Sequence, residues 1–375
     1  MIECVRCGSK IAALRCQCPD GLAVINADCR VVAADLGGLA AIVTDPPYGL
    51  GFMGRGWAFA VPGVELWELF LGACLPGAHL AACGGTRLYH RMAAAIDDAG
   101  WEVRDCLMWR YGSGFPKSLD VSKAIDKAAG VHVPLCKAFN VAGGLKSNGG
   151  SKFRSDHPEY ERRTPAPAAA KRWNGWGTAL KPAWEPITLA RKPLAGTVAA
   201  NVLQHGTGGI NVDGGRVGDD ERFNPSAGIN KIYNQISGGK TFGRETFGRD
   251  TLGRWPANLA LDESAAAQLD KQQPGVSRFF YTAKANGTDR GNKPEKKLPL
   301  FGESVPEIKN THPTVKPTDL MQWLLALIVP PGAVVFDPFC GSGTTLVAAR
   351  SLGMPAIGAE ISPEYCDIIK QRLDA

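Results

Sequence analysis

Apolar and polar positions along residues 22–129 fall into short blocks whose lengths are typical of strands and helices. The predicted strands are 40–44, 79–83 and 102–109, and the predicted helices are 64–75, which ends at Pro76-Gly77, and 88–99. Strands that alternate with helices in this way predict a parallel sheet with helices on its faces.

The same alternation returns in residues 311–375. The predicted helices are 319–329, 344–352 and 363–373, and the predicted strands are 333–336 and 356–360. The two flanks of the chain therefore predict an α/β fold class, with one sheet built from both ends of the sequence.

Residues 130–310 are different, because Gly, Pro, Asn, Lys and Arg are dense there and long periodic helices are absent. They predict a loop-rich insert with short strands at most, at 258–261 and 277–282. A five-residue repeat of the form T-F/L-G-R covers 241–254. We interpret this repeat as a flexible basic arm, and a plain linker is the alternative.

Charge is unevenly distributed along the 375 residues, which carry a net charge of +6. Residues 130–310 hold 26 Lys and Arg against 17 Asp and Glu, which favours contact with a polyanion. No apolar run approaches the about 18 residues of a membrane span, and the N-terminus does not resemble a secretory signal. The 11 cysteines fit a reducing compartment, so we expect a cytoplasmic protein with no membrane partner.

The strongest cofactor signal is residues 334–345, where an apolar strand leads into a glycine turn and then a helix. Gly341 and Gly343 let the backbone approach a ligand, and the helix N-terminus offers free N–H groups to a carboxylate. Glu360 ends the next strand, where an acid accepts hydrogen bonds from ribose hydroxyls. Asp337 would repel a pyrophosphate, which favours S-adenosylmethionine over a dinucleotide; a tight turn without a ligand is the alternative.

Asp45-Pro46-Pro47-Tyr48 follows a buried strand, at the edge of the sheet where α/β proteins bind ligands. The groups in this segment suit a reaction at the exocyclic amine of a nucleic-acid base. Such an amine is a poor nucleophile, because its lone pair is delocalised into the ring. The Asp45 carboxylate and the Pro46 carbonyl can accept hydrogen bonds from its two N–H groups and so free the lone pair. Tyr48 can stack on the base. The segment thus predicts amino methylation through positioning and electrostatics. A strand-to-loop corner without chemistry is the alternative.

Taken together, D-P-P-Y at 45–48 and F-C-G-S-G at 339–343 resemble the catalytic and cofactor motifs of amino-directed DNA methyltransferases. The catalytic motif comes first, as in the permuted β class of that family. Thr314-Val315-Lys316-Pro317 resembles the Lys-Pro element that precedes the cofactor strand in that class. The resemblance implies a Rossmann-like S-adenosylmethionine methyltransferase sheet with permuted motif order.

The resemblance also implies a domain organisation. It makes 22–129 the catalytic half and 311–375 the cofactor-binding half of one methyltransferase domain, with 130–310 as an inserted target-recognition region. Residues 1–21 form a separate cysteine-containing segment.

Carried over residue by residue, the resemblance assigns Asp45, Pro46, Pro47 and Tyr48 to the target base, and Asp337, Phe339, Gly341, Gly343, Glu360, Asp28, Lys316 and Pro317 to the cofactor. Asp28 is alternatively a helix N-cap. Residues 111–118 line the base or DNA channel, or form an ordinary loop. Asp45 implies N6 of adenine, since N4-cytosine members tend to carry Ser at that position.

The implied partner is double-stranded DNA, from which the target base must flip out. The candidate DNA contacts are Arg162, Arg163, Lys171, Arg172, Arg244, Arg249 and Arg254. The recognition sequence stays open, as does the choice between a monomer and a homodimer.

Four cysteines near the N-terminus are spaced as CxxC and CxC, at Cys4, Cys7, Cys16 and Cys18. Four thiolates could hold a structural zinc in a small knuckle. The alternative is a set of reduced surface thiols on a loose tail.

Other functions are consistent with parts of this pattern. An N4-cytosine methyltransferase shares both motifs, and an RNA or protein-glutamine methyltransferase can share the D-P-P-Y corner. A catalytically silent DNA-binding module would need an unseen defect, since both motifs are complete. A dinucleotide oxidoreductase is disfavoured by Asp337 and by the lack of a third glycine in the turn.

Overall fold

We describe the protein from a computed structural model. The described residues are 3–11, 16–49, 60–112, 114, 118–130, 167–222, 251–283, 310, 312 and 315–374, with the side chains of 219–222 and 251–252 left out. The chain forms two compact units, one made of Met1–Gly112 with Trp184–Ala375 and the other of Ser113–Ala183. None of the described helices is both long enough and apolar enough to cross a membrane.

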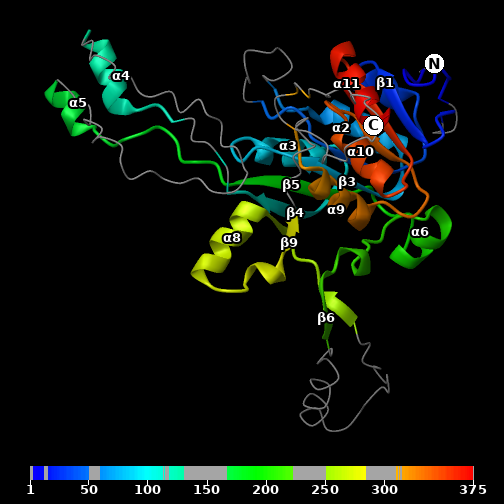
Figure 1. The fold of residues 1–375 in the computed structure, drawn as a ribbon. Coiled ribbons are helices and arrows are strands. Elements are labelled where there is room, and N and C mark those ends of the chain that lie inside the picture. Colours follow the sequence, from blue (N-terminus) through cyan, green and yellow to red (C-terminus); the bar gives the residue numbers. More distant parts are fainter. Residues whose placement is uncertain are drawn as a thin grey trace, which may run out of the picture. The chain divides into compact units, whose positions relative to one another are not determined.

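A nine-stranded sheet, counted over the described residues, forms the centre of the first unit (Figure 1). In sheet order its strands are β1 (Leu22–Asn26), β11 (Ala356–Glu360), β10 (Val335–Asp337), β2 (Leu39–Thr44), β3 (Cys74–Cys83), β5 (Trp184–Arg191), β4 (Glu102–Arg110), β8 (Leu259–Asp262) and β9 (Tyr281–Ala283). Strand β5 is antiparallel to both of its neighbours, and every other neighbouring pair is parallel. The carboxyl ends of the parallel strands and the amino end of β5 therefore meet at one edge of the sheet.

Helices cover both faces of this sheet, because side chains alternate between the two faces along each strand. On β2, Ala41 and Val43 belong to one buried cluster and Ile42 to the other. The first face packs against α9 (Thr318–Ile328), α10 (Thr344–Ser351) and α11 (Pro363–Asp374), and the second against α1 (Cys29–Ala34), α2 (Val64–Ala73) and α3 (Tyr89–Asp98). The predicted α/β fold class is confirmed.

The remaining elements of the first unit lie within 198–283. They are the helices α6 (Val198–His205) and α8 (Glu263–Gln272), the short 3-10 helices η3 (Asp213–Gly215) and η4 (Ser277–Phe279), and the two-stranded ribbon of β6 (Val217–Arg222) and β7 (Thr251–Arg254). The third copy of the five-residue repeat thus forms a strand, and the first two copies lie outside the described residues.

The boundaries predicted for the insert differ from the structure. Strands β5, β8 and β9 come from 130–310 but belong to the main sheet, and the separate compact unit is the shorter Ser113–Ala183. Strand β5 was missed because its apolar core is only Ile187, Leu189 and Ala190 within a segment rich in Pro and Lys. The segment 277–282, predicted as a strand, is a 3-10 turn followed by the short strand β9.

The helix predicted over 64–75 ends earlier than expected, at Ala73, and β3 begins at once. Pro76-Gly77 lies inside that strand. The ammonium of Lys192 donates to the carbonyls of Leu71 and Cys74, at 2.8 and 2.7 Å. These bonds satisfy carbonyl groups at the end of α2, so the helix ends there without a glycine or proline turn.

The second unit holds α4 (Val121–Ala128) and α5 (Ala168–Arg172), which pack on each other. Asp120 begins α4 by accepting a hydrogen bond from the Lys123 N–H at 3.1 Å. An antiparallel bridge joins Asp120 to Gly177, so two segments far apart in sequence are tied together.

Candidate active site

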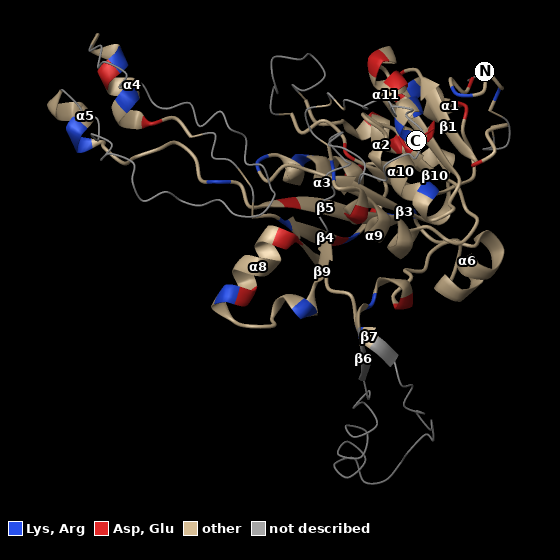
Figure 2. Ribbon diagram, in the orientation of Figure 1, with Lys and Arg blue, Asp and Glu red and all other residues tan. Residues whose placement is uncertain are grey.

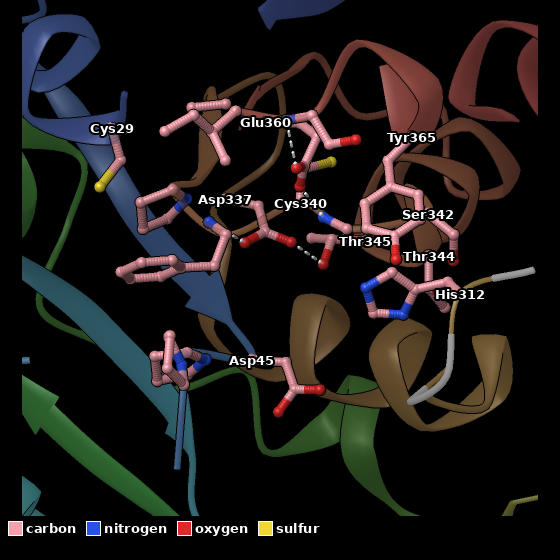
Figure 3. Close-up of a pocket in the computed structure, with 18 of the residues that line it drawn as sticks. Cys29, Asp45, His312, Asp337, Cys340, Ser342, Thr344, Thr345, Glu360 and Tyr365 are labelled. Atoms are coloured by element: carbon pink, nitrogen blue, oxygen red, sulfur yellow. Dashed lines mark hydrogen bonds between the residues drawn. The ribbon is translucent and has the colours of Figure 1, made fainter. Parts of the chain in front are cut away.

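A cavity of about 440 Å³ opens at the carboxyl ends of β1, β11, β10 and β2 (Figure 3). Its volume is within the range of small-molecule sites. The predicted site residues that line it are Asp28, Asp45, Pro46, Pro47, Tyr48, Lys316, Asp337, Phe339, Gly341 and Glu360. The two motifs, more than two hundred residues apart in sequence, share one cavity because their strands β2 and β10 are paired neighbours.

Asp337 links the two motifs. Its buried carboxylate accepts hydrogen bonds from the Thr44 hydroxyl at 2.7 Å, from the Thr345 hydroxyl and from the Phe339 N–H at 3.1 Å. Thr44 immediately precedes Asp45, so Asp337 fixes the end of β2 against the start of the cofactor turn. Burial raises the pKa of Asp337 to about 6, and the three hydrogen bonds oppose the shift.

We expect this carboxyl group to make stability depend on pH. Its pKa rises from an ordinary 3.8 to about 6 on folding, so the folded chain holds the proton more tightly than the unfolded chain. The contribution is greatest below pH about 4 and is lost as the pH rises through about 6, a change of about 3 kcal/mol. Urea unfolding of the wild type and of Asp337→Asn measures this change between pH 4 and 7. Relative to the variant, the free energy of unfolding of the wild type should be higher at pH 4 than at pH 7, by up to about 3 kcal/mol. A difference that is constant across this range contradicts the prediction.

At the other end of the cavity, four polar side chains form a connected network. The Tyr48 hydroxyl donates to Asp45 Oδ1 at 2.6 Å. The Lys316 ammonium donates to Asp45 Oδ2 at 2.8 Å and to the Tyr48 oxygen at 2.9 Å, and pairs with Glu185 Oε2 at 3.1 Å. These bonds fix the orientation of the Asp45 carboxylate and the Tyr48 ring.

Burial and charge have opposite effects on the Lys316 ammonium, which is 8% exposed. Burial lowers the pKa of Lys316, but the charges of Asp45 and Glu185 outweigh it and raise that pKa above its ordinary value. Burial and the same two carboxylates raise the pKa of Tyr48 well above the ordinary phenol value. Lys316 is therefore a fixed cation and Tyr48 a neutral phenol at any physiological pH.

The glycine turn depends on the conformations that its two glycines adopt. Gly341 and Gly343 have φ of 55° and 81°, in the left-handed region. A Cβ at Gly343 would lie 2.9 Å from side-chain atoms of Ile369. The buried Arg372 guanidinium donates to the carbonyl of Ser342 at 2.7 Å and so stabilises the turn between the two glycines.

Two acids lie beside this turn at the ends of β1 and β11. The Glu360 carboxylate accepts hydrogen bonds from the N–H groups of Gly341 and Ser362, both at 2.8 Å. Burial raises the pKa of Glu360, and these N–H bonds oppose the shift. Asp28 is the N-cap of α1 and also lines the cavity, so both interpretations of this residue fit the structure. The hydrogen bond from Arg30 lowers the pKa of Asp28.

Glu185, His312 and Tyr365 are among the polar lining residues that were not predicted. Glu185 is the second residue of β5, and the reversed direction of this strand brings its amino end to the edge where Asp45 lies. Figure 3 shows His312 and Tyr365 beside each other near the glycine turn, with ring centroids 4.7 Å apart. The only sequence signal that could have indicated Glu185 is its place directly before Pro186 and a short apolar run.

Three of the predicted cofactor residues make contacts in the fold that the sequence did not indicate. The Lys316 ammonium binds Asp45 and Glu185, which puts it at the catalytic motif. Pro317 is the N-cap residue of α9 and Gly343 that of α10, and neither is among the described residues that line the cavity. Of residues 111–118, those described are 111, 112, 114 and 118, and none of these lines it.

The candidate DNA contacts divide into three groups. Arg162, Arg163, Arg244 and Arg249 lie outside the described residues. Lys171 and Arg172 lie in the exposed last turn of α5, and Figure 2 shows basic positions on both α4 and α5. Arg254 is buried at 8% exposure, with its guanidinium 5.0 Å from the Phe279 ring and donating to the Arg278 carbonyl. These contacts lend no support to a DNA contact at Arg254, which stays a prediction.

Comparison with known proteins gives short matches to curated relatives. The chain is 42% identical over 64 residues to the type II methyltransferase M2.DpnII of Streptococcus pneumoniae, which is 17% of this chain and 24% of that protein. It is 41% identical over 70 residues to the orphan methyltransferase M.BamHII of Bacillus amyloliquefaciens, 19% of this chain and 26% of that protein. The matches thus span about a quarter of the length of these relatives.

Among solved structures, the M1.HpyAVI–SAM complex matches with a TM-score of 0.42 and 16% identity, covering 94% of this chain and 98% of the other. The cytosine-N4-specific PvuII DNA methyltransferase matches with a TM-score of 0.43 and 13% identity, covering 93% and 85%. The family model described as DNA methylase, for N6 and N4 methyltransferases, matches residues 39–371. Because that match covers most of the chain and both motifs, the protein belongs to the DNA methylase family.

Proposed function

We propose that this chain transfers a methyl group from S-adenosylmethionine to the exocyclic amino group of a base in duplex DNA, N6 of adenine. The observation that carries the proposal is that Asp45-Pro46-Pro47-Tyr48 and the Gly341 turn line one cavity. The motif at each end of the cavity fits one of the two reactants.

The acidic character of the cavity supports the choice of cofactor. Asp28, Asp337 and Glu360 lie at the ends of three neighbouring strands, and the one Lys or Arg among the described lining residues is held by Asp45 and Glu185. Such a site suits a cationic ligand without phosphates. S-adenosylmethionine would supply a methyl group on a positively charged sulfur, activated for transfer. The Glu360 carboxylate retains lone pairs that can accept hydrogen bonds from the hydroxyl groups of a ribose.

The residues at the D-P-P-Y end suit a planar base that carries an amine. Tyr48 and Lys316 each occupy one oxygen of the Asp45 carboxylate, and lone pairs remain for an N–H donor. Asp45 and the Pro46 carbonyl would accept the two N–H bonds of the amine and draw its lone pair out of the ring. The partly buried, neutral Tyr48 would stack on the base. The role of these groups is orientation and charge stabilisation.

DNA is proposed as the partner on the basis of surface chemistry in the second unit. Lys171 and Arg172 lie next to Trp173 and Trp176, which are 39% and 60% exposed. Basic groups contact phosphates and exposed indoles can stack on bases. We extend the proposal to the role of this unit, Ser113–Ala183, as part of the target-recognition region.

The test is transfer of label from methyl-labelled S-adenosylmethionine to duplex DNA, RNA or protein, followed by digestion and identification of the modified product. N6-methyldeoxyadenosine from DNA supports the proposal. N4-methyldeoxycytidine would retain the enzyme class and refute the choice of adenine. Label in RNA or protein alone would refute the choice of DNA.

We expect DNA affinity to depend strongly on salt. The logarithm of the binding constant should fall with the logarithm of salt concentration by about 0.9 per phosphate contacted. A Lys171→Ala, Arg172→Ala double variant should reduce that slope by about 1 to 2, measured by fluorescence anisotropy. Lys10→Ala, an exposed lysine of the N-terminal segment, is the control. Equal slopes for the double variant and the wild type contradict a phosphate contact at α5.

A further inference from the structure

Four cysteines outside the cavity converge on one point near the N-terminus. The sulfur atoms of Cys4, Cys7, Cys16 and Cys18 all lie within 4.8 Å of one another. Four Zn–S bonds of about 2.3 Å in a tetrahedron place the sulfurs about 3.8 Å apart. The Sγ atoms of Cys4 and Cys18 are 3.7 Å apart. The cluster matches a four-thiolate site in the number, kind and spacing of its ligand atoms.

We propose that these four cysteines bind one structural zinc ion. All four are free thiols in the structure. Disulfide formation needs two sulfurs about 2.05 Å apart and gives no reason for two pairs to meet at one point. A single metal ion that binds four thiolates requires this convergence.

The backbone around the first pair has the shape of a ligand loop. The Gly8 N–H donates to the Cys4 carbonyl at 2.8 Å, and the Cys4 N–H donates to the Ser9 carbonyl at 2.9 Å. Gly8 has φ of 68°, which reverses the chain directly after Cys7. Both cysteines of this pair are thus presented to one side of a tight turn.

The cluster is attached to the outer strand of the sheet, which indicates what the metal does. Cys4 is fully buried, and the Val5 N–H donates to the Val24 carbonyl of β1 at 2.8 Å. The Arg6 guanidinium donates to the Leu22 carbonyl at 2.9 Å and pairs with Asp374 of α11 at 3.2 Å. Zinc would hold this segment over the β1 edge, where it donates hydrogen bonds to the carbonyls of Leu22 and Val24. None of the four cysteines lines the cavity, so the ion has no part in the proposed reaction.

Metal content measured on the full chain, purified in reducing buffer and incubated with Zn²⁺, tests the proposal. The wild type and Cys106→Ser should each retain one zinc per chain after gel filtration, and Cys7→Ser should lose it. Cys7 and Cys106 are both exposed free thiols, so the pair is matched. Less than about a tenth of an equivalent in the wild type, or equal zinc in the two variants, overturns the proposal.

Two measurements on the wild type keep the test valid if Cys7→Ser does not fold. X-ray absorption should give four sulfur neighbours at about 2.3 Å, and nitrogen or oxygen neighbours in their place would overturn the site. Hydrogen exchange of the Val5 amide should accelerate by at least about tenfold on chelation. Mass spectrometry that finds two disulfides in place of zinc would also overturn it.

Discussion

Asp45→Asn is expected to lower the rate of methyl transfer by about a thousandfold or more, while the dissociation constant for S-adenosylmethionine changes by no more than about twofold. Asparagine keeps the shape of the side chain but replaces one acceptor oxygen with an N–H donor, so a single oxygen is left to accept from the amine and from the groups that hold Asp45 in place. It also removes the negative charge that pairs with Lys316 at 2.8 Å. The loss of activity should therefore appear in kcat and not in the affinity for S-adenosylmethionine.

Single-turnover transfer of labelled methyl groups to duplex DNA measures the rate, and titration calorimetry measures cofactor affinity. Asp98→Asn, an exposed carboxylate at the end of α3, is the control and should retain full activity. A rate for Asp45→Asn within about tenfold of the wild type would refute the role proposed for Asp45.

The parts of the site that the sequence predicts are those where a strand ends in a chemically distinctive residue. Asp45 follows β2, Asp337 ends β10 and Glu360 ends β11. Each comes after a short apolar run, and parallel strands bring such ends to one edge of a sheet. Local pattern was enough here, because the carboxyl ends of parallel strands share one edge whatever the order of the strands in the sheet.

The parts that the sequence does not predict depend on pairings between distant segments. Lys316 lies 271 residues from Asp45, and its position next to Pro317 gives no sign that its partner is the Asp45 carboxylate. Glu185 reaches the site only because β5 runs antiparallel between β3 and β4. Arg254 belongs to a repeat that looks exposed and basic, yet its pairing in β7 buries it against Phe279. In each case tertiary contacts decide the outcome, and local propensity does not encode them.

Lys316→Met is expected to lower the free energy of unfolding by about 3 to 5 kcal/mol, because removing one partner of a buried ion pair leaves uncompensated charge. Lys316 is the cation between Asp45 and Glu185, at 2.8 and 3.1 Å. Methionine is an unbranched side chain only one heavy atom shorter than lysine, so most of the packing is kept while the charge is removed. Urea unfolding at pH 7 measures the loss. Lys370→Met is the matched control, because its ion pair with Asp367 is exposed and 3.8 Å long and should contribute less than about 1 kcal/mol.

Adding Glu185→Gln to Lys316→Met should recover at least about 1 kcal/mol of that loss, since it removes one of the two carboxylates that the methionine leaves facing each other. The recovery is specific to charge, because glutamine has nearly the shape of glutamate. If the double variant is no more stable than Lys316→Met alone, the loss comes from packing, and Lys316 does not neutralise the two carboxylates. If the double variant recovers stability but transfers methyl groups more slowly than the wild type, Lys316 has a second role, which is to orient Asp45 through a hydrogen bond that glutamine at position 185 does not replace.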